Sequence, residues 1–537
     1  MQPMRHSTSR IHGACRAQWL FAITALAAFV IVGCGGDPAC TGASCDGTSG
    51  AGASGASGAS GAGGGAGSGA TPAECVPNGA TDAVQGGCGV FVSSSLGDDA
   101  NDGTKDSPLK TLAAAILQAN AGGGRVYACA ELFGEAVLVS AKTEIYGGLD
   151  CNRGWVYVGD TTKTSIVAPA GSIAATFGPS VNGARLEDLR FEAQAARVPG
   201  GSAIAIVVDQ AEDVELSRCE VVAGDGAPGT PGDTPPGTGA PGAVGADGAD
   251  GCLDTLAVPG GAGGQIDCGN GESSWGGQGG PGTTEGGSES DGQDGGWVPA
   301  PASAQNGGNG QSFGIACEAG MPGVPGENGD PGVGATGFGT LDTNGFLGTA
   351  GGDGISRGKP GLGGGGGGGG HGLTVCSPNA GPSGGGGGSG GCGGLPGKGG
   401  GPGGSSIGIV VFGETVATLA SSTIVTGKGG DGGAGSNGQP GGDGGPGGAG
   451  SCSGGVGGPG GRGGAGGGGL GGHSIGVARS GGSVTFVDGS AVTYGAGGAG
   501  GPGGDGGSGN YGAPGDAGKE CTGLDLQDTD NPFACFH

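Results

Sequence analysis

The stretch that decides the fold is IAIVVDQAEDVELSRCEVVAG, residues 204–224, because the chain contains it in three versions. The second is IGIVVFGETVATLASSTIVTG, residues 407–427, and the third is IGVARSGGSVTFVDGSAVTYG, residues 475–495. An alignment without gaps places Leu216, Leu419 and Val487 at one position of the repeat. Apolar residues recur at every second position, which is typical of strands that turn one face inward. Each copy therefore predicts one coil of a solenoid.

Upstream of the first copy, residues 88–224 have an ordinary composition and contain short β-rich pieces about 20 residues apart. Strands that recur at even spacing, with turns between them, favour stacked coils over separate sheets. We therefore assign residues 88–224 to one solenoid domain. The predicted strand regions are Val137–Val139, Thr143–Tyr146, Ser165–Val167, Leu186–Phe191, Ile204–Val208 and Val214–Val222.

The domain begins with an acidic turn followed by a helical pattern. Ser107 is a candidate cap, Pro108 suits a first helical position, and Leu109, Leu112 and Ile116 share one helix face. The run GDDANDGTKDSPLKTLAAA (97–115), then RVYACAELFGEAVLV (125–139) and IYGGLDCNRGW (145–155), resembles the entry of pectin-lyase-like proteins. That resemblance implies an all-β, right-handed parallel β-helix whose first coil is capped by the acidic turn and a short helix.

Glycine-rich insertions separate the later coils, at about 225–310, 318–403, 428–472 and 496–520, and a weaker coil fragment lies at 312–315. We interpret them as loops projecting from successive coils of one solenoid, with flexible linkers between separate domains as the alternative. Residues 225–537 are thus a glycine-rich region with interleaved coils.

From Gly429 to Gly450 every third residue is glycine. Collagen requires strict triplets with abundant proline, but here the register breaks at Ser453. Two interpretations remain open. The segments are either disordered, because ordering glycine is entropically costly, or they form a bundle of extended helices with three residues per turn. The second resembles the glycine-rich domains of PE-PGRS proteins.

The N-terminus predicts export. A basic segment precedes the apolar run Trp19–Val32, which is shorter than the roughly 20 residues that span a bilayer. It ends in Ile31-Val32-Gly33-Cys34, which resembles a lipobox, so residues 1–33 are a lipoprotein signal peptide and Cys34 is the lipid-attachment site. Residues 34–87, rich in Gly, Ala and Ser, form the tether. Gly35 after the cysteine resembles the sorting context for an outer membrane, so we expect the protein at the cell surface.

Composition limits the partners and the chemistry. Glycine accounts for 153 of 537 residues, and the net charge of −27 argues against nucleic acid as a partner. Of 17 cysteines, Cys15 leaves with the signal and Cys34 is lipidated, which leaves 15 for seven bridges and one thiol. An oxidising compartment favours disulfides. The candidates, with the pairings suggested by spacing, are Cys129 with Cys151, Cys252 with Cys268, Cys376 with Cys392, and Cys521 with Cys535.

Two functions from different classes compete. The first is a non-catalytic surface protein, structural or adhesive, that meets glycans or matrix polymers and needs no cofactor. The second is a calcium-dependent polysaccharide lyase or another carbohydrate-active β-helix enzyme. Its weak calcium candidates are Asp98, Asp99, Asp102 and Asp106, beside Lys105 and Lys110, although turns favour Asp for backbone reasons alone.

No residue is assigned a catalytic role, so the sequence favours the non-enzymatic function. Glu187 and Asp188 are adjacent, which predicts that they point to opposite faces of a strand and cannot act together. Asp209, Glu212 and Asp213, with Arg218, predict a solvated corner. Asp431, Asp443 and Asp505 lie in GGDGG contexts that lack the aliphatic residue of RTX calcium repeats.

Overall fold

The structure is a computed structural model that describes residues 75–77, 83–122, 124–253, 256–284, 290–298, 316–343, 345–373, 376–526 and 535–536. The chain divides into two compact units, residues 1–65 and 66–537, and all described residues lie in the second. The predicted signal peptide, Cys34 and most of the tether therefore lie outside the described residues. Among those described, no helix is long and apolar enough to cross a membrane.

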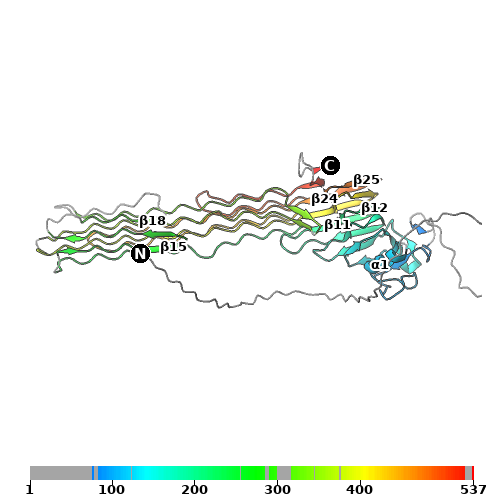
Figure 1. Cartoon of the computed structure of the whole chain (residues 1–537), viewed down its shortest axis with the longest axis horizontal. Coiled ribbons are helices and arrows are strands. Elements are labelled where there is room, and N and C mark those ends of the chain that lie inside the picture. The colour runs from blue at the N-terminus through cyan, green and yellow to red at the C-terminus, as the bar shows by residue number, and fades with distance from the viewer. Residues whose placement is uncertain are drawn as a thin grey trace, which may run out of the picture. The chain divides into compact units, whose positions relative to one another are not determined.

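Three parallel sheets form the body of this unit (Figure 1). The first contains β1 (Val90–Val92), β2 (Arg125–Cys129), β5 (Glu144–Asp150), β9 (Asn182–Glu187), β12 (Glu212–Ser217), β22 (Val416–Ala420) and β25 (Ser483–Val487), with β6 (Val156–Tyr157) antiparallel to β5. The second contains β3 (Leu132–Phe133), β7 (Thr164–Ala168), β10 (Leu189–Ala193), β13 (Glu220–Ala223), β23 (Thr423–Thr426) and β26 (Ala491–Thr493). The third contains β4 (Val137–Val139), β8 (Ala175–Phe177), β11 (Ala203–Asp209), β21 (Ser406–Phe412), β24 (Ser474–Ser480), β27 (Glu520–Asp525) and β28 (Cys535–Phe536).

Each coil contributes one strand to each sheet in turn, so the chain winds as a parallel β-helix. The predicted all-β fold and its parallel β-helix are confirmed. Inward-facing residues such as Ile166, Leu186 and Val208 make one continuous core. The helix α1 (Leu112–Gly122) closes the first end of that core with Leu112 and Ile116. It begins at Leu112, so the expectation that Ser107 caps it and Pro108 starts it is wrong. Thr111 accepts the N–H of Ala114, and Glu135 accepts those of Leu112 and Ala113.

The repeat sets the register of the later coils. Ile204 pairs with Ile407, which pairs with Ile475, and Leu216 pairs with Leu419. The gapless alignment is wrong at one point, because Leu419 pairs with Phe486 and not with Val487. The third copy reaches β25 one residue early and regains the register before β26. Because β11 pairs directly with β21, no further coil lies between them, and the fragment at 312–315 falls outside the described residues.

The glycine-rich insertions all leave the β-helix at the same corner. Residues 224–405 connect β13 to β21, residues 427–473 connect β23 to β24, and residues 494–519 connect β26 to β27. Each insertion therefore leaves the second sheet and returns to the third. We call their described parts the glycine array. Within it lie short antiparallel hairpins, including β15 (Gln265–Gly269) with β16 (Glu272–Trp275) and β19 (Thr340–Asp342) with β20 (Gly345–Leu347).

Backbone hydrogen bonds with a three-residue period hold the array together. Its extended segments lie side by side (Figure 1). The N–H groups of Gly429, Gly432 and Gly435 donate to Ala496, Ala499 and Pro502, at 2.8 to 2.9 Å, in a parallel arrangement. The next residue of each triplet bonds to a different neighbour, as Gly430 does to Gly404 in an antiparallel arrangement. The array is thus an ordered bundle of extended segments with three residues per turn, and the disordered alternative does not describe these residues.

The number of neighbouring backbone segments determines which positions of a triplet must be glycine. A Cβ on Gly432 would lie 2.1 Å from the carbonyl oxygen of Gly469, and one on Gly433 would lie 1.9 Å from that of Thr230. The third position of this triplet, Ala434, is half-buried and carries a side chain. Uninterrupted glycine runs such as 363–370 are buried throughout. Segments with a free face therefore read Gly-Gly-X, and enclosed segments read Gly-Gly-Gly.

Candidate functional site

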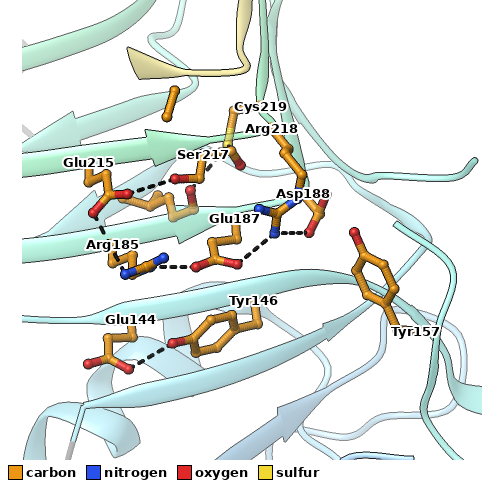
Figure 2. Close-up of polar contacts among 12 residues, drawn as sticks. Glu144, Tyr146, Tyr157, Arg185, Glu187, Asp188, Glu215, Ser217, Arg218 and Cys219 are labelled. Carbon is orange, nitrogen blue, oxygen red and sulfur yellow. Dashed lines mark hydrogen bonds and ion pairs between the residues drawn. The ribbon is translucent and has the colours of Figure 1, made fainter. Parts of the chain in front are cut away.

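A cluster of charged side chains occupies the corner between the first and second sheets (Figure 2). Glu187 ends β9, Leu189 begins β10, and Asp188 between them has a φ of +56°. This left-handed conformation breaks the alternation of a strand, so both carboxylates reach the same guanidinium group. The expectation that Glu187 and Asp188 point to opposite faces and cannot act together is therefore wrong.

Arg218 holds the two carboxylates from the next coil. Its Nη2 lies 2.6 Å from Glu187 Oε2 and 2.7 Å from Asp188 Oδ2, and its Nε donates to Asp188 Oδ1 at 3.1 Å. Arg218 itself has a φ of +51° between β12 and β13, so it occupies the same corner one coil later. Glu187 and Asp188 are only 1% and 2% exposed, so they need such partners. The predicted solvated corner is correct for Glu212 and Asp213, which are exposed, and wrong for Arg218.

Further cations complete the charge balance. Arg185 binds Glu187, and Lys163 Nζ lies 3.7 Å from Asp188 Oδ1. Burial alone would lower the pKa of Arg218, but its hydrogen bonds to Asp188 and Glu187 hold that pKa above the ordinary value. Burial, reinforced by the charge of Asp188, raises the pKa of Tyr157. A general acid or base needs a pKa near the working pH, whereas this cluster consists of compensated ion pairs. Its geometry suits a clamp between consecutive coils.

The acidic turn places its carboxylates on backbone donors. Asp98 accepts the N–H of Ala100, and Asp102 accepts both the N–H and the hydroxyl of Thr104. Asp99 accepts the N–H groups of Lys110 and Thr111. Burial would raise the pKa of Asp99, but these hydrogen bonds lower it.

Asp106 is exposed on the same turn. Within the part of the chain that the structure describes, no three His, Cys, Asp or Glu side chains gather where they could hold a metal ion. Asp98, Asp99 and Asp102 therefore stabilise the turn through their hydrogen bonds.

The cysteines pair both within the β-helix and across segments of the array. Cys129–Cys151 and Cys521–Cys535 form as expected, but Cys252 pairs with Cys376 and Cys268 with Cys392. The pairings Cys252–Cys268 and Cys376–Cys392 are wrong because the equal spacing has another cause. The N–H groups of Gly261 and Gly264 donate to Gly384 O and Gly387 O, so these two segments of the array run parallel, and each pair of partners is separated by 124 residues.

Two more bridges and one thiol were not assigned from the sequence. Cys75–Cys88 lies at the start of the β-helix, and Cys317–Cys452 joins two segments of the array. Cys219 is free and fully buried in the core, where burial raises its thiol pKa to about 12. The odd number of cysteines in the sequence pointed to one thiol without identifying it.

Where the glycine pattern of the array is interrupted, side chains form hydrogen bonds to the backbone of a neighbouring segment. At Ser436 and Gln439 the buried position of the triplet is not glycine. Ser436 Oγ donates to Asp233 O at 2.8 Å and Gln439 Nε2 donates to Pro236 O at 2.6 Å. Acidic side chains on the free face act similarly, since Asp431 Oδ1 accepts the N–H of Ala499 at 2.8 Å. The interruptions of the glycine pattern thus maintain the hydrogen bonding of the array.

A cavity of about 300 Å³ lies where the array leaves the β-helix. Ile173 and Ile204 line it from the third sheet and the turn before it, and Phe346 lines it from the β19–β20 hairpin. Ser202 and the exposed Arg197 add polar groups. The cavity combines an apolar surface with one guanidinium group, which suits a small ligand that carries a negative charge.

No family model matches the chain, and no curated protein matches it. Two solved structures are similar to part of it. One is the GH136 lacto-N-biosidase from Eubacterium ramulus, at 18% identity and a TM-score of 0.20, covering 25% of this chain and 26% of that chain. The other is a rhamnogalacturonan lyase, at 14% identity and a TM-score of 0.12, covering 26% of this chain and 41% of that chain. The chain thus spans less than half of either structure, and similarity at this level carries no argument about activity.

Proposed function

We propose that this chain is an exported, lipid-anchored structural protein of the cell surface, in which a β-helix carries a rigid glycine array. The observation that carries the proposal is the common origin of the insertions. All of them leave one corner of the β-helix and are joined by backbone hydrogen bonds, and the disulfide Cys317–Cys452 also links the first insertion to the second. At about 3.1 Å per residue, the extended segment 429–450 measures about 70 Å. An ordered, cross-linked module of this length suits a spacer or a scaffold.

The free faces of the array give it a hydrated contact surface. Asp431, Asn437 and Asp443 occupy exposed third positions of their triplets, and the whole chain carries a net charge of −27. Such polar groups suit the hydroxyl-rich polymers of a cell surface or matrix. The charged clamp at Arg218 supports a non-catalytic role, because its carboxylates are committed to ion pairs.

Hydrogen exchange tests the rigid array directly. In the purified full-length protein, array peptides around Gly430–Gly448 should exchange far more slowly than expected for unstructured glycine-rich chain, because their N–H groups are hydrogen-bonded. Exchange at the unstructured rate would reject the scaffold.

Lipid attachment needs its own experiment. Cells fed a palmitate analogue should label the wild-type protein, and Cys34→Ala should lose the label. Cys40→Ala is the matched control, since it removes another cysteine from the same region. Equal labelling of wild type and Cys34→Ala would reject the anchor.

The cavity beside Arg197 offers a test of glycan contact. Binding of the purified protein to a panel of acidic glycans should weaken in Arg197→Ala. It should persist in Arg357→Ala, because Arg357 does not line the cavity. Calcium-dependent cleavage of polygalacturonate, followed by the absorbance of the unsaturated product, would instead establish the lyase. Absence of glycan binding in the wild type would reject this part of the proposal.

A further inference from the structure

The two ends of the β-helix are built differently. At the first end, α1 packs against β1, β2 and β4, and its apolar residues join the core. At the last end, the third sheet finishes with β28, which runs antiparallel to β27 and is tied by Cys521–Cys535. The first and second sheets end at β25 and β26, and no other described strand pairs with their outer edges.

Core positions at this last end remain partly exposed. Val484, Phe486 and Val492 pack against the core but are only partly buried. Their partners one coil earlier, Ala417, Leu419 and Ile424, are all 0% exposed. The last coil thus presents to solvent a surface that every earlier coil buries against its successor.

The backbone of β25 is also oriented for a further strand. Ser483 donates its N–H to Thr415 O at 2.8 Å, and Val487 O accepts the N–H of Ser421 at 3.3 Å. These two residues therefore direct their peptide groups toward the preceding coil. Since successive residues of a strand direct these groups to opposite sides, Val484 and Phe486 direct theirs to the outer edge.

The composition of this edge does not oppose self-association. Natural edge strands are commonly protected by lysine, proline or a bulge. Residues 480–494 contain neither lysine nor proline, and their one charged residue is Asp488, in a chain of net charge −27. The net negative charge of the chain repels a second copy, but this edge carries a single negative charge and adds little to that repulsion.

We propose that the open end of the β-helix is an interface for a second copy of the chain, joined tail to tail. Head-to-tail stacking is blocked because α1 covers the other end. A two-fold axis across the open end sets β25 antiparallel to β25 of the second copy, which is a favourable pairing for two edge strands. The pairing continues the first sheet and covers Val484 and Phe486. Solenoids need capped ends to stay soluble, and here the cap is the second copy.

A lysine at the edge tests this interface. Thr485 is exposed at the centre of β25, so Thr485→Lys should leave the fold intact but place like charges close together across the two-fold axis. Thr418→Lys is the matched control, because Thr418 pairs with Thr485 but lies one coil inside the sheet. In sedimentation velocity of the full-length protein in mild detergent, wild type and Thr418→Lys should dimerise. Thr485→Lys should dimerise at least 10-fold more weakly.

Cysteine cross-linking supplies a second measurement on intact cells. Under mild oxidation, Thr485→Cys should form a covalent dimer, and Thr418→Cys should stay monomeric. The proposal is overturned if the wild type is monomeric at all concentrations. It is also overturned if Thr485→Lys and Thr418→Lys dimerise equally, because the contact then lies elsewhere.

Discussion

Exchanging two neighbouring residues of the array tests the rule that neighbours decide where glycine must stand. The double variant Gly433→Ala/Ala434→Gly keeps the composition but moves the methyl group from the free face to a buried one. Gly433 is buried and its N–H donates to Gly401 O at 2.8 Å. Its φ is not in the left-handed region, so any penalty comes from contact and not from the backbone conformation.

The expected penalty follows from one distance. The new Cβ would lie 1.9 Å from Thr230 O, whereas ordinary contact begins at 3.4 Å, so the neighbouring backbone must retreat by about 1.5 Å. Overpacking of this kind costs about 1–3 kcal/mol, and each array hydrogen bond weakened by the shift adds about 1 kcal/mol. Gly433→Ala lowers the conformational entropy of the unfolded chain, which would stabilise the fold by less than about 1 kcal/mol. Ala434→Gly has the opposite effect and cancels this gain. The sum is a net loss of at least about 2 kcal/mol.

Hydrogen exchange with mass spectrometry measures this loss where it occurs. A local loss of about 2 kcal/mol corresponds to about 30-fold faster exchange in peptides around residues 425–450. Ala434→Gly alone is the control and should change exchange little, since it removes a methyl group from the free face. Exchange in the double variant equal to or slower than in wild type would refute the packing rule.

Three further predictions follow from the buried groups. Arg218→Met should lower the free energy of unfolding by about 3 kcal/mol, because two buried carboxylates lose their main partner. The control is Arg185→Met, which should cost far less because the Arg185 side chain is 46% exposed. Equal urea midpoints for the two variants would contradict the clamp. Burial lowers the pKa of His473 to about 4, against about 6.5 in the unfolded chain. The neutral imidazole therefore contributes on the order of 3 kcal/mol to the free energy of unfolding above pH 6.5, and this contribution is lost as the pH falls toward 4. The difference in the free energy of unfolding between wild type and His473→Gln should therefore shrink as the pH falls from 6.5 to 4. A constant difference would contradict the lowered pKa of His473. Non-reducing peptide mapping should find Cys252 joined to Cys376, and recovery of Cys252 joined to Cys268 would contradict the parallel arrangement of these two segments.

Much of the β-helix could be predicted because its coils repeat in the sequence. The alternation around Ile204, Ile407 and Ile475 is local, and the structure stacks these three residues directly. The alignment failed at Phe486 because a coil can shorten one turn and lengthen the next without losing its stacking. The strand predictions Leu186–Phe191 and Val214–Val222 each span a corner, at Asp188 and Arg218. Each corner is formed by a single residue in the left-handed conformation, and the presence of an Asp or an Arg does not predict that conformation from the sequence.

By itself, the sequence determined the β-helix, the places where the glycine segments interrupt it, and the surplus of cysteines available for bridges. Those properties follow from periodicity and composition, which neighbouring residues carry. Tertiary structure alone decided that the glycine segments are ordered, which cysteines pair, and that Glu187 and Asp188 share Arg218. The reason is the separation along the sequence between the residues in contact. Gly430 donates its N–H to the nearby Gly404, whereas Gly226 donates to Lys428, far along the chain. A local sequence pattern specifies neither partner.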